Sequence, residues 1–259
     1  MKSSRCPHVA SFGAETLRRC LKSRQPALGT WCSLPSVPAV EVISGVGFDW
    51  ICVDLQHGHA TQADLPAVLR AARTPSLVRV PWNEPATIMN ALDLGAAGVV
   101  VPMVHDAAAA RAAVEACRYA PSGARSWGPM RNGRPPAEAN EDVVCIVMIE
   151  SMAGVDAVDE IVKTPGIDGV LLGPADLSLS AYGELGGDLK EMKVHVAHAC
   201  SNAGVWAGIA CRGPLEAADA YALGFRLLLL GWDLTLLENA ETHLLNEARQ
   251  ALGDVMTGG

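Results

Sequence analysis

Ionisable side chains stand where apolar stretches of the sequence end, a position from which they could meet at one site. Asp54 closes an apolar run and is followed by His57. Arg79 interrupts a second run, Glu150 ends a third, and Asp176 comes shortly after a fourth. A histidine can move a proton, an arginine can hold an oxyanion, and carboxylates can bind a hard cation. These residue types together predict metal-assisted acid–base chemistry on an oxygen-rich substrate.

Two of these side chains, Glu150 and Asp176, are candidate metal ligands. The sequence has no cluster of Cys and His with metal-ligand spacing. Two carboxylates in a glycine-rich neighbourhood suit Mg²⁺ or Mn²⁺, with Co²⁺ as an alternative. In the peptide Gly173-Pro174-Ala175-Asp176, an expected helix start, the backbone N–H groups of Ala175 and Asp176 can receive a substrate carboxylate.

Each residue also has a structural interpretation when it is taken alone. An Asp after a strand is often a helix N-cap, which fits Asp176 as well as a ligand role does. Arg79 could be half of a structural ion pair, and a single histidine such as His57 is more often a hydrogen-bonded scaffold residue. Glu150 is harder to explain in this way, because a carboxylate that ends an apolar strand is unfavourable unless it is paired or bound to metal. The convergence of all four favours a functional site.

Lysine is scarce, and its few positions exclude one type of chemistry. A Schiff-base enzyme on a barrel scaffold needs a lysine within a strand or at its C-terminal end. The five lysines all stand outside the apolar runs: Lys2, Lys22, Lys163, Lys190 and Lys193. The sequence therefore predicts no Schiff-base lysine, and a metal ion would have to serve as the electron sink for a carbanion.

Short apolar runs alternate with longer stretches of helical spacing along the chain. The expected strands are 27–34, 50–54, 77–80, 98–101, 143–149, 169–172, 206–209 and 226–230. The expected helices are 62–72, 84–93, 106–117, 155–162, 190–202 and 214–223. Eight largely unalternating strands between helices predict an α/β protein of the (β/α)₈ TIM-barrel class. A doubly wound open sheet is the alternative, although Gly45-Val46-Gly47 precedes a strand rather than following one, unlike a dinucleotide-binding loop.

We expect one TIM-barrel domain over 1–259, with an N-terminal extension and helix at 1–24, the barrel at 25–233, and a C-terminal helix and tail at 234–259. The leucine-rich segment 234–252 either packs on a neighbouring subunit or is the eighth helix, covering its own barrel. Segment 119–140 is too long for an ordinary connection and is predicted to be a functional loop. Its Arg125 and Arg131 either receive a distal carboxylate of the substrate or lie on the surface.

Composition excludes several classes of protein. The formal net charge of −8 and the pI near 5.3 argue against a nucleic-acid partner, which calls for a basic face. No apolar run approaches the roughly 18–20 residues of a membrane-spanning helix, and the N-terminus lacks the apolar core of a secretory signal. Eight scattered cysteines without a C-x-x-C pair are interpreted as reduced thiols of a cytoplasmic protein.

Seven motifs occur in order between Leu28 and Gly231: WCSL (31–34), GFDWICVDLQHG (47–58), LVRV (77–80), LDLGAAGVVVPMV (92–104), RYAPSGARSWGP (118–129), MIES (148–151) and GVLLGPADLS (169–178). Together they resemble the HpcH/HpaI aldolase family, metal-dependent pyruvate aldolases typified by 4-hydroxy-2-oxoheptanedioate aldolase. The resemblance implies a barrel of the phosphoenolpyruvate/pyruvate-domain type. It also implies a homo-oligomer, typically a hexamer of two trimers joined by exchanged C-terminal helices.

The resemblance further implies roles for particular residues. Glu150 and Asp176 resemble the two metal ligands of the family, and Arg79 resembles the arginine that holds the keto or enolate oxygen. His57 resembles the catalytic base, which acts through a water molecule on the metal, with Asp54 as its orienting partner.

Other family positions concern the substrate and the neighbouring subunit. Ala175 and Asp176, after Gly173 and Pro174, would supply backbone donors to the pyruvate carboxylate, and Trp31 would form a wall beside the methyl group. Asp93 matches an acidic position near the active site at the subunit boundary. The chain departs from the family at Gln56, where well-studied members have Glu, and at Met148, where many have Gln, which bears on donor preference and metal affinity.

The implied reaction is reversible cleavage of a 4-hydroxy-2-oxo acid into an aldehyde and pyruvate, or a close analogue such as hydroxypyruvate, through a metal-stabilised enolate. Alternatives within the superfamily are a CoA-ester lyase and an enzyme that decarboxylates oxaloacetate. An alternative from another class is a metabolite-binding barrel without catalysis, which the presence of all four strand-end residues disfavours.

Overall fold

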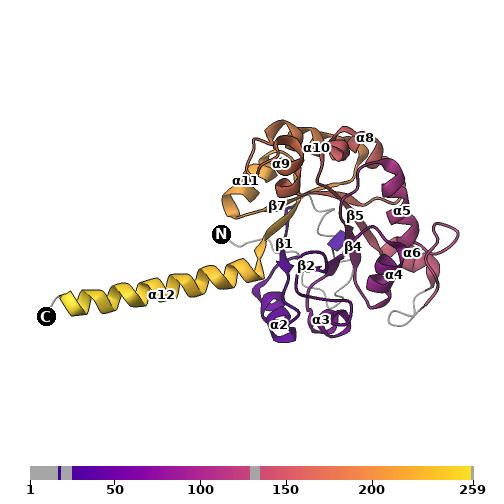
Figure 1. Ribbon diagram of the computed structural model, residues 1–259. Helices are drawn as coiled ribbons and strands as arrows, with labels where there is room; N and C mark the ends of the chain where they lie inside the picture. The colour runs from indigo at the N-terminus through magenta and orange to yellow at the C-terminus, as the bar shows by residue number, and fades with distance from the viewer. Residues whose placement is uncertain (1–16, 19–24, 129–134, 258–259) are drawn as a thin grey trace.

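The computed structural model describes residues 17–18, 25–128 and 135–257, and in this part of the chain eight parallel strands form a closed barrel (Figure 1). Each strand pairs with the next in sequence, and the last pairs with the first. The strands are β1 (Ala27–Cys32), β2 (Trp50–Asp54), β3 (Ser76–Arg79), β4 (Gly98–Val101), β5 (Val144–Ile149), β6 (Gly169–Leu172), β7 (Trp206–Cys211) and β8 (Leu227–Trp232). The predicted TIM barrel is confirmed, and closure of the sheet excludes the doubly wound alternative.

Helices follow the strands around the outside of the barrel. They are α2 (Val37–Val46), α3 (Leu65–Ala71), α4 (Pro85–Asp93), α5 (Ala107–Cys117), α6 (Pro136–Asp142), α7 (Met152–Asp156), α8 (Val158–Ile161), α9 (Pro174–Tyr182), α10 (Lys190–Ala203), α11 (Pro214–Ala222) and α12 (Asp233–Thr257). The expected helix over 155–162 is instead two short helices, α7 and α8, that meet at Ala157. Helix α2 was not expected, because its valine-rich sequence has weak helix propensity; Ser36 caps it by accepting a hydrogen bond from the Ala39 amide.

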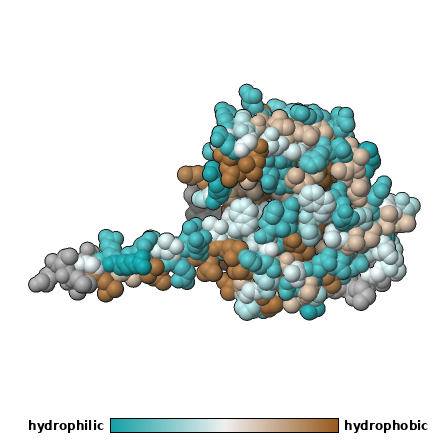
Figure 2. All heavy atoms as spheres, viewed as in Figure 1, coloured by the Kyte–Doolittle hydropathy of each residue, from teal (hydrophilic) through white to brown (hydrophobic). Residues whose placement is uncertain are grey.

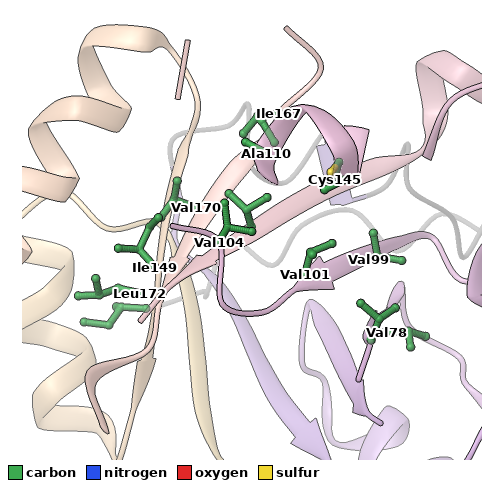
Figure 3. Close-up of a cluster of buried hydrophobic side chains, with 14 of the residues drawn as sticks. Val78, Val99, Val101, Val104, Ala110, Cys145, Ile149, Ile167, Val170 and Leu172 are labelled. Atoms are coloured by element: carbon green, nitrogen blue, oxygen red, sulfur yellow. The ribbon is translucent and has the colours of Figure 1, made fainter. Parts of the chain in front are cut away.

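The strands are buried on both faces, and this explains their unalternating apolar sequences. Side chains that point into the barrel form one cluster, which includes Trp31, Trp50 and Leu77. Side chains that point outward pack beneath the helices in a second cluster, part of which Figure 3 shows around Val101 and Ile149. Alternation along each strand therefore fixes which residues face the interior of the barrel, and the strand-end residues inherit that direction.

The segment 119–140 lies at the end of the barrel that is opposite its own active site. It connects α5 to β5, and helix-to-strand connections in this fold lie at the amino ends of the strands, opposite the catalytic face. Part of the segment is helix α6, and residues 129–134, including Arg131, are outside the described residues. Strand direction therefore places this loop at the end of its own barrel that is opposite the catalytic face.

The cysteines of the described residues are buried thiols without disulfides: Cys32, Cys52, Cys117, Cys145, Cys200 and Cys211. Burial raises the pKa of Cys32 and of Cys200 to about 12, which keeps these thiols protonated at neutral pH. They behave as small core residues. The expectation of reduced thiols also covered Cys6 and Cys20, which lie outside the described residues.

Helix α12 leaves the barrel and extends away from it as a long arm (Figure 1). Its contacts with the barrel are made to β8 and β1, and every residue from 235 to 253 is exposed. The interpretation of this segment as a helix covering its own barrel is therefore wrong. No helix among the described residues is long and apolar enough to cross a membrane.

Candidate active site

The carboxyl ends of β2 and β3 carry a buried ion pair. Asp54 and Arg79 are neighbours in the strand register, and the guanidinium contacts the carboxylate with two nitrogens. Arg79 Nε donates to Asp54 Oδ1 at 2.8 Å and Nη2 donates to Oδ2 at 2.6 Å. Both side chains are almost completely buried. A bidentate pair of this kind fixes the plane of the guanidinium and leaves its remaining nitrogen, Nη1, for another acceptor.

Asp54 is therefore the partner of Arg79 rather than of the His57 ring. It accepts the backbone amides of Gln56 at 3.0 Å and His57 at 3.3 Å, so its contact with His57 is through the main chain. Burial favours a raised pKa, but the hydrogen bonds and charge of Arg79, with the two amides, outweigh it and the pKa of Asp54 is lowered. The expected orientation of the His57 ring by Asp54 gives way to this pairing, because Arg79 takes both carboxylate oxygens. His57 itself is exposed at the mouth of the barrel.

A second contact holds Arg79 from the side. Its guanidinium carbon lies 4.0 Å from the centroid of the Trp31 ring, a close cation–π contact. Trp31 in turn stacks on Trp232, with ring centroids 5.7 Å apart and ring planes 7° apart. Trp31, which was expected to form a wall of the substrate site, is buried against Arg79 and Trp232. Arg79 is therefore held by contacts from other strands: by Asp54 of β2, and by Trp31 of β1, which is itself supported by Trp232 of β8.

Glu150 follows β5 directly and is only 3% exposed. Its Oε2 accepts the backbone amide of Met103 at 2.9 Å, and Met103 has the left-handed backbone φ of 55° that is rare for a side chain of its size. Burial raises the pKa of Glu150, and the negative charges of Asp176 and Asp54 raise it further. The hydrogen bond from the Met103 amide and the positive charge of Arg79 lower it, but they do not outweigh burial. Asp54, Arg79 and Asp176 therefore lie close enough for their charges to act on the Glu150 carboxyl.

Helix α9 begins beside Glu150. A side-chain carbon added at Gly173 would come within 2.8 Å of Cγ and Oε1 of Glu150. Any larger residue at this position would therefore clash with the Glu150 carboxylate. Gly173 is the N-cap and Pro174 occupies the first turn of the helix. The first helical hydrogen bond comes from the Leu177 amide to Gly173 O, so the amides of Ala175 and Asp176 precede it. Asp176 lies in the first turn and is not the N-cap.

The donor set of this site fits a divalent metal ion with oxygen ligands. Glu150 has one oxygen anchored by Met103, its other oxygen faces Gly173, and the charge of Asp176 acts on it. No group of three or more His, Cys, Asp or Glu in the described part of the chain forms a metal cage. Mg²⁺ keeps several waters and commonly takes one or two carboxylates, so two protein ligands suit an ion that also binds substrate.

Asp93 and Arg125 lie apart from this group. Arg125 Nη2 donates to Asp93 Oδ1 at 2.6 Å, and its guanidinium lies 4.5 Å from the Tyr119 ring centroid. Asp93 is the last residue of α4, at the amino-end side of the barrel. Arg125 thus has a carboxylate partner of its own chain, which disfavours its expected use for a distal substrate carboxylate. Both residues therefore lie toward the end of the barrel that is opposite the candidate active site.

Asp233 is a further strand-end carboxylate that the sequence interpretation did not single out. Its two oxygens accept the backbone amides of Ser33 and Leu34 at 3.0 Å, which fastens the end of β1 to the start of α12. The signal was available, because Asp233 follows an apolar strand as Asp54 ends one. Its role is to position the β1 loop at the mouth of the barrel.

Comparisons with known proteins identify the family of this chain and agree with its barrel fold. The family model described as HpcH/HpaI aldolase/citrate lyase matches residues 28–240. The chain is 33% identical to a hydroxypyruvate/pyruvate aldolase of Rhizorhabdus wittichii, over 90% of this chain and 98% of that protein. It is 32% identical to a 2-dehydro-3,6-dideoxy-6-sulfogluconate aldolase of Pseudomonas putida, over 87% of this chain and 93% of that protein. A crystal structure of an HpcH/HpaI aldolase/citrate lyase family protein from Burkholderia cenocepacia is similar with a TM-score of 0.83, 33% identity, and coverage of 90% and 98%.

Proposed function

The chain belongs to the HpcH/HpaI aldolase/citrate lyase family and is a carbon–carbon lyase, and from that premise we propose that it is a divalent-metal-dependent aldolase. Its substrates would be a 4-hydroxy-2-oxo acid in the direction of cleavage, and an aldehyde with pyruvate or hydroxypyruvate in the direction of synthesis. The observation that carries this proposal is the convergence at the carboxyl ends of the strands: the charges of Arg79 and Asp176 both act on the Glu150 carboxyl, and Gly173, three residues before Asp176, lies against that carboxyl. Relatives named as pyruvate and hydroxypyruvate aldolases support the substrate class.

Arg79 would stabilise the negative charge that develops on the keto oxygen when the bond between C3 and C4 breaks. Two of its nitrogens are fixed by Asp54 and its face is fixed by Trp31, so Nη1 is held in one direction. A donor held in this way costs little reorganisation when charge appears, and such donors are commonly worth about 10²–10³-fold in rate. Asp54 and Trp31 are positioning residues in this scheme.

His57 would remove the proton of the C4 hydroxyl during cleavage and return it during synthesis. It lies directly after the strand that carries Asp54, and it is exposed at the mouth, where it can exchange protons with substrate and solvent. The amides of Ala175 and Asp176, at the start of α9, would bind the substrate carboxylate. Glu150 and Asp176 would hold the divalent cation, which supplies Lewis-acid polarisation of the 2-oxo acid.

Chelation and borohydride trapping test the reaction class directly. We expect EDTA to remove cleavage of 4-hydroxy-2-oxo acids and Mg²⁺ or Mn²⁺ to restore it, because the described lysines lie outside the strands and cannot form an imine at the site. Coupled detection of released pyruvate measures the activity. Activity that survives EDTA, together with irreversible inactivation by borohydride in the presence of pyruvate, would contradict the proposal.

We also propose that the enzyme is a homo-oligomer, a hexamer of two trimers, in which α12 packs on other copies of the chain. The arm is about 37 Å long, and a solvated helix of this kind depends on packing for its stability. Figure 2 shows hydrophobic residues along one side of the arm, and five of its leucines are 50–65% exposed: Leu236, Leu237, Leu244, Leu245 and Leu252. Asp93, which ends α4 on the side of the barrel opposite its own site, would then lie near a neighbour's active site.

Charged substitutions on the arm test this assembly. The double variant Leu237→Asp, Leu244→Asp is expected to sediment as a smaller species, at or near the 27.1 kDa of one chain, because it places two carboxylates in an apolar interface. Sedimentation velocity measures the change. The matched control is Thr242→Asp, which stands about 160° around the helix from Leu244 and should leave the assembly intact. A double variant that keeps the wild-type mass would exclude α12 as the interface.

A further inference from the structure

The Glu150 carboxylate is anchored by an uncommon turn of the backbone. Its Oε2 accepts the amide of Met103, which lies in the loop after β4. Among the residues that the structure describes, Met103 is the one non-glycine residue with a positive φ, at 55°. A long side chain is unfavourable in this left-handed conformation, because its Cβ crowds the backbone. A local restraint on Met103 would therefore control the position of the Glu150 carboxylate.

His105 supplies such a restraint two residues further along the loop. Its ring Nδ1 lies 2.7 Å from Oγ of Ser151, and Ser151 directly follows Glu150. The two contacts thus join the same two short stretches of chain, one after β4 and one after β5. Residues in strained conformations persist where the surrounding contacts over-determine them. Here the contacts hold Met103 at its own amide and at the residue two positions later.

Further contacts fix Ser151 and the loop, which makes the His105 contact a built feature. Ser151 is the N-cap of α7, and its Oγ accepts the Gly154 amide at 3.1 Å. That bond leaves the hydroxyl proton for Nδ1 of His105, with the ring proton on Nε2. A side-chain carbon added at Gly154 would come 2.9 Å from the Val104 carbonyl oxygen, so α7 begins against the same loop. Val104 itself packs in the apolar cluster beneath the helices, where Figure 3 shows it near Ile149.

We propose that His105 is a positioning residue of the candidate metal site. Its hydrogen bond with Ser151 holds Met103 in the left-handed conformation. The Met103 amide, in turn, holds the Glu150 carboxylate in the orientation in which it binds a divalent cation. This inference rests on the proposed function, which makes Glu150 a metal ligand. Hydrogen-bond partners that orient a ligand are commonly worth about 10–100-fold in metal affinity, and His105 acts one step further out, so we expect about tenfold.

The first test needs no metal: hydrogen–deuterium exchange of the full-length apoprotein, followed by mass spectrometry on a peptide that contains Met103. We expect His105→Ala to speed exchange of the Met103 amide about tenfold, the value of one hydrogen bond, while peptides from the other strands exchange as in the wild type. His105→Asn should restore the wild-type rate, because its side-chain amide carries a polar atom at the position of Nδ1. His195→Ala is the matched control, since it removes a half-exposed histidine of α10 that contacts Asp159. Unchanged exchange in His105→Ala would overturn the proposal.

The second test is the affinity for Mn²⁺, measured by isothermal titration calorimetry. His105→Ala is expected to raise the Kd for Mn²⁺ about tenfold, and His105→Asn and His195→Ala should leave it near the wild-type value. Met103→Gly tests the route through the turn, because glycine adopts a positive φ without steric cost. In that background His105→Ala should raise the Kd less than about twofold. An equal loss of affinity in both backgrounds would show that His105 does not act through Met103 and would contradict the proposal.

The two tests separate this inference from the proposed function. A wild-type protein that binds no Mn²⁺ would contradict the metal-dependent aldolase, whereas faster exchange at Met103 in His105→Ala would still support the restraint on the turn. Conversely, equal Mn²⁺ affinity in the wild type and in His105→Ala would overturn the positioning role and leave the proposed function intact. Ser151→Gly provides a second variant, because it removes the partner of His105 while glycine remains a tolerated N-cap. It should speed exchange and weaken Mn²⁺ binding to the same extent as His105→Ala.

Discussion

Replacing Arg79 with lysine is expected to lower kcat/KM for aldol cleavage by about 10²–10³-fold, the usual cost of losing a preorganised oxyanion donor. Lysine keeps the positive charge but not the planar fork that contacts Asp54 with two nitrogens and stacks on Trp31. A single ammonium group can satisfy Asp54 or reach the substrate, but it cannot do both in the present geometry. Steady-state kinetics on a 4-hydroxy-2-oxo acid measure the loss.

Proton exchange at the methyl group of pyruvate isolates the step assigned to Arg79. Enolisation should be lost in Arg79→Lys and in Arg79→Ala, as followed by deuterium incorporation from heavy water. Arg212→Lys is the matched control, because Arg212 also pairs with a carboxylate, Glu216, but is exposed at the end of β7. Exchange at the wild-type rate in both Arg79 variants would remove this residue from the reaction.

The substitution Arg79→Ala is also expected to change the pKa of Asp54. In the protein, Arg79 outweighs burial and the pKa of Asp54 is lowered. In Arg79→Ala only the amides of Gln56 and His57 would oppose burial, so the pKa of Asp54 should rise. The ionised carboxylate then becomes unfavourable in the folded state, and the variant should lose stability as pH increases through that raised pKa. Breaking a buried pair in this way typically costs about 3–5 kcal/mol.

The sequence was sufficient to predict the barrel and the residues that meet at its mouth. Strands buried on both faces are nearly continuous apolar runs, so an ionisable residue at the end of one is conspicuous. Asp54, Arg79 and Glu150 are each at the end of, or directly after, a strand, and parallel closure brings such ends to one face. The rule depends only on strand direction, which alternation with helices already determines.

What the sequence could not supply was the pairing between side chains. Asp54 is three residues before His57 in the chain, and the family resemblance implied that these two side chains pair. In the fold, register places Asp54 opposite Arg79 on the next strand, and a cation with two donors competes better for the carboxylate than a ring does. Pairing across strands depends on register, which a single sequence does not reveal.

The positions of segment 119–140 and of helix α12 could not be predicted for a different reason. The composition of segment 119–140 indicated an unusual connection but not the face on which it lies. Its position follows from the order of elements, because it connects α5 to β5 at the amino ends of the strands. Similarly, the leucines of α12 fit either its own barrel or another chain, and only the direction of the helix after β8 distinguishes them.

Glu150 and Asp176 allow the metal proposal to be tested without an activity assay. Because burial and neighbouring carboxylates raise the pKa of Glu150, its ionised form above that pKa is less favourable in the folded apoprotein than in the unfolded chain. A bound divalent cation would reverse this effect by supplying the missing positive charge. Stability with and without metal therefore reports the role of Glu150 separately from catalysis.

Glu150→Gln is expected to leave the apoprotein at least as stable as the wild type, to abolish stabilisation by Mn²⁺ or Mg²⁺, and to lower activity by more than about 10³-fold. Glutamine retains the size of the side chain and an acceptor for the Met103 amide, but it carries no charge for a cation. Thermal unfolding with and without metal measures the first two effects. Asp176→Asn should lose metal stabilisation with little change in the apoprotein, since Asp176 is exposed, and the control Asp219→Asn on α11 should retain it. A Glu150→Gln protein that metal stabilises as much as it does the wild type would contradict Glu150 as a ligand. The metal would then have to be held elsewhere, and Glu150 would need another explanation for its burial.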